Sequence, residues 1–94
     1  MPRSNPFAKP ASNVTSEANA KKEGCKNYIS KGEGVQWVQY ELCKEGYQAK
    51  IDDCGGIDGE CGKDTVECIK DFQTKKGLEV DGICGPATRR ALEG

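Results

Sequence analysis

The chain has 94 residues, with 14 basic and 15 acidic side chains, six cysteines, no histidine and a net charge of −1. A chain of this length holds one small domain. Residues 25–94 carry ten basic and thirteen acidic residues without a basic stripe, which argues against nucleic acid as a partner. No apolar run approaches the roughly 18 residues of a membrane span, so we expect no membrane partner either.

Residues 1–24 contain three of the four prolines together with Ser, Asn, Ala and Lys, and show no apolar periodicity. This composition is typical of a linker. We therefore expect residues 1–24 to be a linker or N-terminal extension and residues 25–94 to be the domain. Because the N-terminus has no apolar signal core, we expect the chain to be an excerpt of a longer exported protein.

Three segments with helical periodicity follow. They span about residues 34–45, 63–76 and 86–93, and Gly46 and Gly77 are placed to end the first two. The expected inward faces consist of Val35, Val38, Gln39 and Leu42, then Thr65, Cys68, Ile69 and Phe72, then Thr88, Ala91 and Leu92. The pattern predicts an all-α fold, a small orthogonal bundle of three helices.

The sequence Asp-Gly-x-Cys-Gly-x-x-Thr occurs twice, once before the second helix and once before the third. Asp58 and Asp81 can accept hydrogen bonds from turn amides, and each following glycine can adopt positive φ. Pro86 suits the first position of a helix. We expect two pseudo-repeated units in which an Asp-Gly turn starts a helix, with the threonines bonding back toward the cap.

The cysteines are separated by 18, 11, 7, 7 and 16 residues, so none has the C-x-x-C spacing of a zinc knuckle. A small domain has a core of marginal stability, and disulfides commonly compensate for this. We expect three bridges, hence a disulfide-stapled fold, no metal and no cofactor, and leave the pairing open. The six cysteines are Cys25, Cys43, Cys54, Cys61, Cys68 and Cys84.

The segments GEGVQWVQYELCKEGY and IDGECGKDTVECIKDFQTKKGLEVDGICGPATRRAL resemble the three-helix peptidoglycan-binding domain of bacterial cell-wall hydrolases. The resemblance covers about residues 32–93, in order and with near-standard spacing. It departs from the family pattern at Cys61, Cys68 and Cys84, which replace an aromatic and small or aliphatic core residues. We interpret these changes as a core rebuilt with cystines.

The resemblance implies that the ligand is peptidoglycan, through its glycan or its stem peptides. Trp37 and Tyr40 lie opposite the core stripe of their helix, so they either form an exposed platform for sugar rings or are covered by residues 25–30. Arg89 or Arg90 could hold a carboxylate, although a solvated helix surface is the plainer interpretation. Gln39 and Gln73 are expected to serve as buried amides. The candidate ligand-binding residues are Trp37, Tyr40, Tyr47, Asp58, Asp81 and Arg89.

The expected function is a non-catalytic module, monomeric and located in the bacterial cell wall or outside the cell, that holds a covalently attached hydrolase on its polymer. The attached enzyme could be an amidase, a muramidase or an endolysin. The alternative is a protein-interaction or inhibitory pro-domain, in which Cys84 of GICGPAT would block a zinc ion. An enzyme is disfavoured because the chain has no histidine and no nucleophile-base pair at suggestive spacing.

Overall fold

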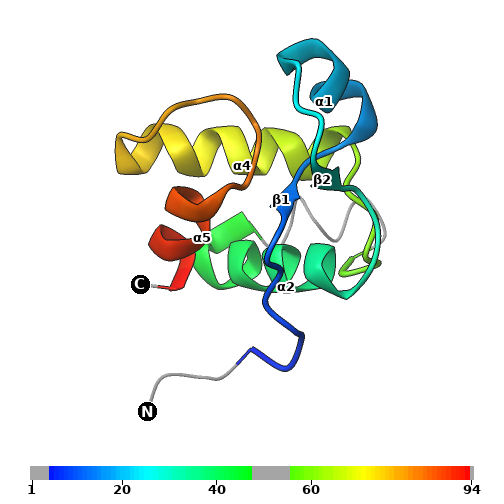
Figure 1. Cartoon of the computed structure of the whole chain (residues 1–94). Coiled ribbons are helices and arrows are strands. Elements are labelled where there is room, and N and C mark those ends of the chain that lie inside the picture. Colours follow the sequence, from blue (N-terminus) through cyan, green and yellow to red (C-terminus); the bar gives the residue numbers. More distant parts are fainter. Residues whose placement is uncertain (1–4, 48–55, 94) are drawn as a thin grey trace.

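The computed structural model describes residues 5–47 and 56–93, and Figure 1 shows their arrangement. In chain order the elements are β1 (Asn13–Val14), α1 (Glu17–Glu23), β2 (Tyr28–Ile29), α2 (Glu33–Leu42), the π-helical turn η1 (Cys43–Tyr47), α4 (Lys63–Lys76) and α5 (Pro86–Glu93). None of the helices in this described part is long and apolar enough to cross a membrane.

The three helices expected from the periodicity are α2, α4 and α5. The bounds of α4 and α5 agree with the prediction, and α2 begins one residue earlier and passes into η1. Gly77 ends α4 at φ 69°, and its amide bonds to the carbonyls of Gln73 and Thr74. Gly46 lies at φ 106° and interrupts the helical backbone of η1. Glycines at positive φ therefore end both segments, because such a backbone strains any side chain with a Cβ.

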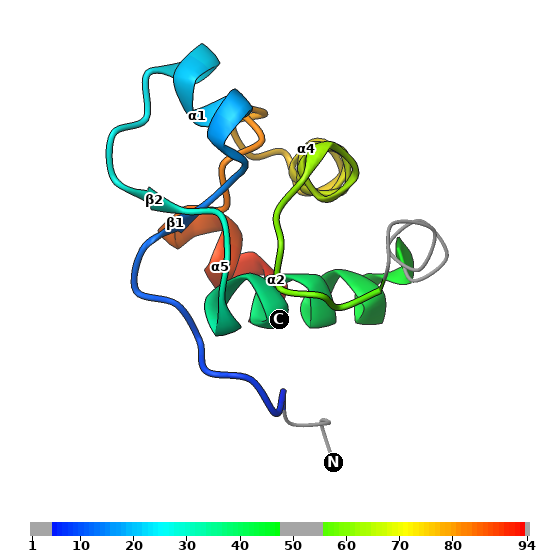
Figure 2. The same cartoon turned by 90° about the vertical axis from the view of Figure 1, so that its right-hand side faces the viewer.

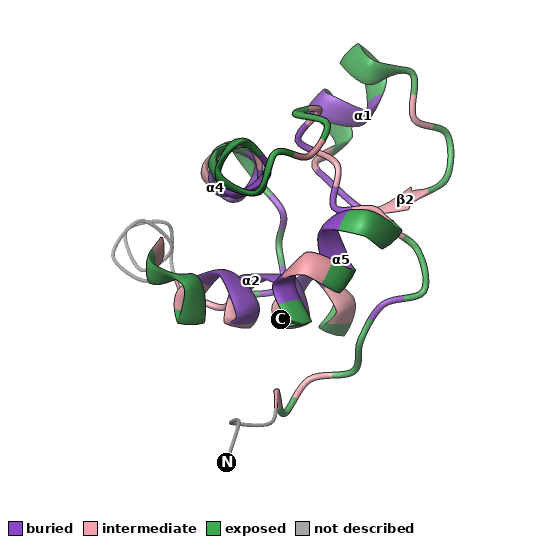
Figure 3. Ribbon diagram, turned by 90° about the vertical axis from the view of Figure 1, so that its left-hand side faces the viewer, coloured by how far each residue is buried: buried purple, intermediate pink, exposed green. Residues whose placement is uncertain are grey.

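The helices cross steeply rather than packing side by side. Figure 2 shows α4 nearly end-on while α2 runs lengthwise below it, with α5 between them. Buried residues of all three helices belong to one core cluster, and Figure 3 colours the buried positions along the ribbon. In this arrangement α2 packs against both α4 and α5.

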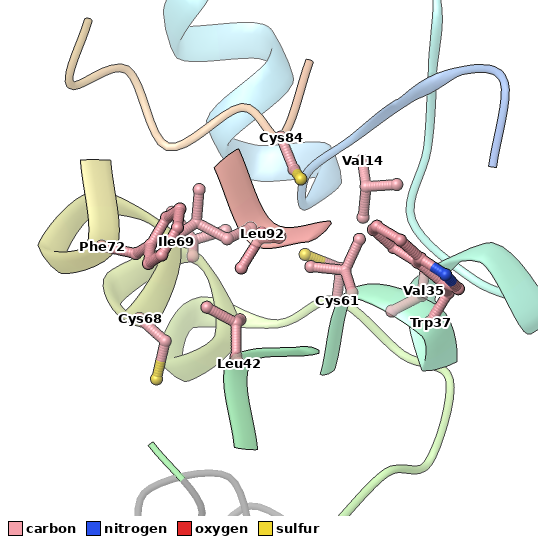
Figure 4. Close-up of a cluster of buried hydrophobic side chains, with 12 residues drawn as sticks. Val14, Val35, Trp37, Leu42, Cys61, Cys68, Ile69, Phe72, Cys84 and Leu92 are labelled. Carbon is pink, nitrogen blue, oxygen red and sulfur yellow. The ribbon is translucent and has the colours of Figure 1, made fainter. Parts of the chain in front are cut away.

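The core between the helices is small and mixed in composition (Figure 4). It contains Phe72 and Ile69 from α4, Leu42 from α2 and Leu92 from α5, all almost fully buried. The buried Cys61 and Cys84 take positions in this cluster as well. The predicted inward faces of the three helices are thus buried, except that Ala91 is half-buried.

The N-terminal segment is more ordered than its composition suggests. Ser16 caps α1 by accepting a hydrogen bond from the amide of Asn19, and Gly24 ends the helix in the left-handed conformation. β1 pairs in parallel with β2 and also forms an antiparallel bridge between Val14 and Cys84. Val14 and Ala20 are fully buried. Residues 13–23, which lie in the expected linker or N-terminal extension, therefore pack on the bundle.

Two parts of the predicted fold class are wrong. The described residues contain four α-helices rather than three, together with the short β1–β2 pair. No disulfide joins any two of Cys25, Cys43, Cys61, Cys68 and Cys84, and Cys54 lies outside the described residues. Cys61 and Cys84 instead serve as small apolar side chains in the core.

Candidate functional site

The first Asp-Gly turn is built around the buried amide of Gln39, which α2 holds beneath it. Its Nε2 donates to Asp58 Oδ1 at 3.2 Å, to the carbonyl of Glu60 at 3.1 Å and to Thr65 Oγ1 at 3.3 Å. Its Oε1 accepts from the amide of Gly59 at 3.0 Å. One side chain therefore ties α2 to the turn and to the first turn of α4.

The second Asp-Gly turn repeats this network with Gln73 of α4. Nε2 of Gln73 donates to Asp81 Oδ1 at 3.0 Å, to the carbonyl of Ile83 at 3.0 Å and to Thr88 Oγ1 at 3.1 Å. Its Oε1 accepts from the amides of Asp81 and Gly82 at 3.2 and 3.0 Å. The two glutamines occupy equivalent places in the two halves of the bundle, which confirms the prediction of buried amides and of two pseudo-repeated units.

Both aspartates have a structural task in these turns. Oδ1 of Asp58 accepts from the amide of Glu60, and Oδ1 of Asp81 accepts from the amide of Ile83, each at 2.9 Å. The predicted capping of turn amides is therefore confirmed. The threonines differ from the prediction, because Thr65 and Thr88 accept from the glutamine amides.

A hollow of about 320 Å³ lies at the second turn, between the end of α4 and the start of α5. We call it the α4–α5 hollow. Leu78, Ile83, Pro86 and Ala87 give it apolar walls, and Asn13 and Glu79 are among its polar lining. Val80, in the same turn, is 50% exposed and is the large apolar side chain most open to solvent in the described part. Apolar walls with a few polar groups are the usual composition of a ligand site.

The first turn carries an equivalent but more polar hollow of about 280 Å³. Glu60, Lys63 and Asp64 line it together with Asp58. The two hollows thus occupy related positions in the pseudo-repeat but differ in chemistry. Only the second offers the apolar surface against which the face of a sugar ring could pack.

Trp37 and Tyr40 do not form an exposed platform. Trp37 is only 4% exposed and belongs to the core cluster. The side-chain amide of Asn5 donates to the carbonyl of Trp37 at 3.0 Å. The ring of Phe7 packs edge-on against the half-buried Tyr40, with 6.1 Å between ring centroids. Trp37 is therefore covered rather than exposed, but the contacts come from Asn5 and Phe7 and not from the expected residues 25–30.

Tyr47 lies at the far end of η1 and is half-buried. Its hydroxyl donates to Asp71 Oδ2, and the ammonium of Lys75 lies 5.0 Å from the centre of its ring. Burial, and then the hydrogen bond to Asp71, raise the pKa of the Tyr47 phenol well above its ordinary value. The ring thus has partners within the domain and lies apart from the residues that line the α4–α5 hollow.

Arg89 is 7% exposed, so its guanidinium is not presented to solvent. Its Nη1 donates to the carbonyls of Ser12 and Cys84 at 2.8 and 3.0 Å. The side chain therefore fastens the N-terminal segment to α5. Arg90, the other arginine considered, is exposed on the same helix.

The thiols of Cys61 and Cys84 are buried among apolar side chains. Burial raises the pKa of both to about 12, and the Arg89 charge only partly offsets this at Cys84. A thiol so placed is a poor zinc ligand, because zinc binds the thiolate. Within residues 5–47 and 56–93 no group of three or more Cys, Asp or Glu could hold a metal ion.

The structure therefore brings Asp81 to the α4–α5 hollow and Asp58 to the polar one, and places Trp37, Tyr40, Tyr47 and Arg89 elsewhere. Sequence reasoning missed the apolar walls of the hollow. Leu78 and Ile83 lie on either side of Asp81-Gly82. Apolar residues in an otherwise polar turn were the sequence signal that could have indicated these walls. Asn13 could not be found in this way, because it is the bridge between Val14 and Cys84 that carries β1 to the second turn.

Two solved structures share this fold. The crystal structure of the SleB N-terminal domain matches with a TM-score of 0.68 and 27% identity, over 92% of this chain and 94% of that one. A peptidoglycan-binding protein from Clostridioides difficile, solved with glutamine hydroxamate, matches with a TM-score of 0.59 and 38% identity, over 67% of this chain and 36% of that one. Residues 25–94 make up only about three quarters of the chain, so the SleB match extends into the N-terminal segment.

Sequence relatives with curated descriptions also include cell-wall amidases. The N-acetylmuramoyl-L-alanine amidase CwlL of Bacillus licheniformis is 33% identical over 87 residues, which cover 89% of this chain and 23% of the amidase. The amidase CwlM of Mycobacterium tuberculosis is 41% identical over 49 residues, 48% of this chain and 12% of CwlM. The chain thus spans less than a quarter of these relatives. The family model for the peptidoglycan binding domain matches residues 31–92, a range that includes both Asp-Gly turns. The chain therefore belongs to the peptidoglycan binding domain family.

Proposed function

We propose that this domain attaches a cell-wall hydrolase to peptidoglycan and that the α4–α5 hollow contacts the glycan. The observation that carries the proposal is the position of the hollow. It lies at the second Asp-Gly turn, inside the range matched by the family model. Its apolar walls suit the face of a sugar ring, and its polar groups suit hydroxyl and N-acetyl groups.

We expect a single contact with a hollow of about 320 Å³ to give weak binding. Weak binding is adequate for a module tethered to an insoluble polymer, since repeated contacts raise the effective concentration. The glutamine network beneath the turn supports this role. It holds the walls in place before the ligand arrives, so less ordering accompanies binding.

The test is co-sedimentation of the chain with purified sacculi. In the variant Ala87→Arg a long side chain starts from an exposed position on α5 and covers the hollow without entering the core. We expect the wild-type chain to pellet with the sacculi and the variant to pellet about fivefold less, as for loss of one central contact of an interface.

The matched control is Ala8→Arg. Ala8 is also exposed, but its amide bonds to Glu33 Oε2 beside α2, away from the hollow. The control adds the same charge and should pellet like wild type. If wild type stays in the supernatant, peptidoglycan binding is refuted. If both variants pellet like wild type, the glycan contact lies outside the hollow.

We further propose that the domain is non-catalytic and part of an exported protein that acts in the cell wall. The support is that the curated relatives are N-acetylmuramoyl-L-alanine amidases of which this chain matches only a fraction. Fusion to a peptidoglycan amidase, compared with the amidase alone on sacculi, tests this role. The fusion should release dye-labelled fragments faster at low enzyme concentration, and the isolated domain should release none.

A further inference from the structure

We infer that a second surface, between α1 and α4, binds the carboxylate-bearing stem peptides of peptidoglycan. This inference rests on the proposed function and assigns a different part of the polymer to a different face. The surface is a groove of about 480 Å³, which we call the α1–α4 groove. Its lining includes Ala18, Lys22, Lys63, Val66, Glu67 and Lys70.

The floor of the groove is apolar and fixed. Val66 is 6% exposed and lies at the bottom between the two helices. Gly82 of the second Asp-Gly turn packs so closely beneath that a Cβ there would lie 2.9 Å from both Val66 Cγ1 and Lys70 Cε. The aliphatic stem of Lys70 is therefore held against the turn.

The rim of the groove is cationic. Lys22 and Lys63 are exposed and Lys70 is half-buried, and none of the three forms an ion pair with another described residue. By contrast, Lys9, Lys21, Lys31 and Lys44 each pair with a glutamate. Glu67 is the one acidic residue of the lining, so three positive charges face one negative charge. In a chain of net charge −1, this concentration of cations favours an anionic ligand.

The occupant that matches this chemistry is a short acidic peptide. Its free carboxylates would pair with the lysines at the rim, and its small aliphatic side chains would lie on Val66 and Ala18. Neutral sugar hydroxyls would leave the lysine charges unpaired. The α4–α5 hollow and the α1–α4 groove would then bind the glycan and the peptide of the same polymer.

The test compares untreated sacculi with sacculi whose carboxyls have been converted to amides by carbodiimide coupling with ammonia. The variant is Lys63→Gln/Lys70→Gln, and the matched control is Lys26→Gln/Lys76→Gln, which removes the same charge from exposed positions outside the groove. Apparent affinity is measured by co-sedimentation at low salt, where charge pairs are least screened.

On untreated sacculi we expect the groove variant to bind about fivefold more weakly than wild type, as for loss of two partly solvated charge pairs, and the control to bind like wild type. On amidated sacculi wild type should fall to the level of the groove variant, and the groove variant should change little. The inference is overturned if the groove variant binds untreated sacculi like wild type, or if amidation weakens both equally. Failure of wild type to bind untreated sacculi would instead refute the proposed function, and this inference with it.

Discussion

At the scale of single residues, the side chains of Gln39 and Gln73 account for the repeated motif. Each glutamine projects from the helix that precedes an Asp-Gly turn and hydrogen-bonds the aspartate, the backbone of the turn and the threonine of the next helix. The amide gives hydrogen-bond partners to turn groups that are buried or partly buried, such as the amides of Gly59 and Gly82. The aspartates and glycines thus build the turn, and the glycan contact that we propose rests on its apolar neighbours such as Leu78, Ile83 and Ala87.

Gln73→Leu should destabilise the domain by about 3 kcal/mol, because it leaves the buried amide of Gly82 and the Thr88 hydroxyl without partners. Urea unfolding followed by circular dichroism measures the change. Gln36→Leu is the control, since Gln36 makes no side-chain hydrogen bond to another described residue and the substitution should change stability by less than about 1 kcal/mol. Equal effects of the two substitutions would contradict the structural role of Gln73.

At the scale of elements, the N-terminal segment adds β1 and α1 to the bundle, although its composition is typical of a linker. β1 has two residues and α1 has seven, and both are too short for hydrophobic periodicity to reveal. The bounds of α4 and α5 were predictable because each combines an apolar stripe with a glycine or proline at its end. The cover over Trp37 was not predictable from the pattern of α2, since it includes Asn5, 32 positions earlier in the chain.

The contribution of β1 can be measured with a matched pair of valines. Val14 is fully buried between α2 and the second turn, whereas Val80 is 50% exposed. Val14→Ala should cost about 2 kcal/mol of unfolding free energy, because it removes buried methyl groups and leaves a cavity. Val80→Ala should cost less than about 0.5 kcal/mol. A Val14→Ala variant as stable as wild type in thermal unfolding would show that β1 does not pack as described.

At the scale of the whole molecule, the domain relies on close packing and buried polar networks in place of the expected cystine framework. Cys61, Cys68 and Cys84 are buried in the core, as the sequence predicted. The prediction that they bridge one another is wrong. The sequence gives the number of cysteines and their spacing along the chain. Only the fold determines which of them lie close enough to form a disulfide. Cys61 and Cys84 share one core cluster without being bonded.

These buried thiols predict a loss of stability in alkali. Their pKa is about 12 in the folded chain against an ordinary value of 9, so the unfolded chain releases its protons first as pH rises. The stabilisation is complete below about pH 9 and declines toward pH 12, by up to about 2.7 kcal/mol per pH unit when both thiols contribute. The raised pKa of Tyr47 acts in the same direction.

Denaturant unfolding from pH 7 to pH 11 measures this dependence. The variant Cys61→Ala/Cys84→Ala keeps Tyr47 and should show a shallower decline than wild type, although it starts from a lower stability. A wild-type stability that stays constant from pH 9 to pH 11 would contradict the burial of the two thiols.

The sequence by itself determined the three main helices, the two Asp-Gly turns and the family, because each depends on residues close together in the chain or in a fixed order. The tertiary structure alone decided that Trp37 is covered, that Arg89 fastens the N-terminal segment to α5 and that Cys61 and Cys84 are not bonded to each other. It also decided which polar and apolar side chains line the α4–α5 hollow together. The physical reason is that burial and contact depend on segments that are distant in sequence and pack together only in the folded chain. Local sequence patterns do not show which of these segments come into contact.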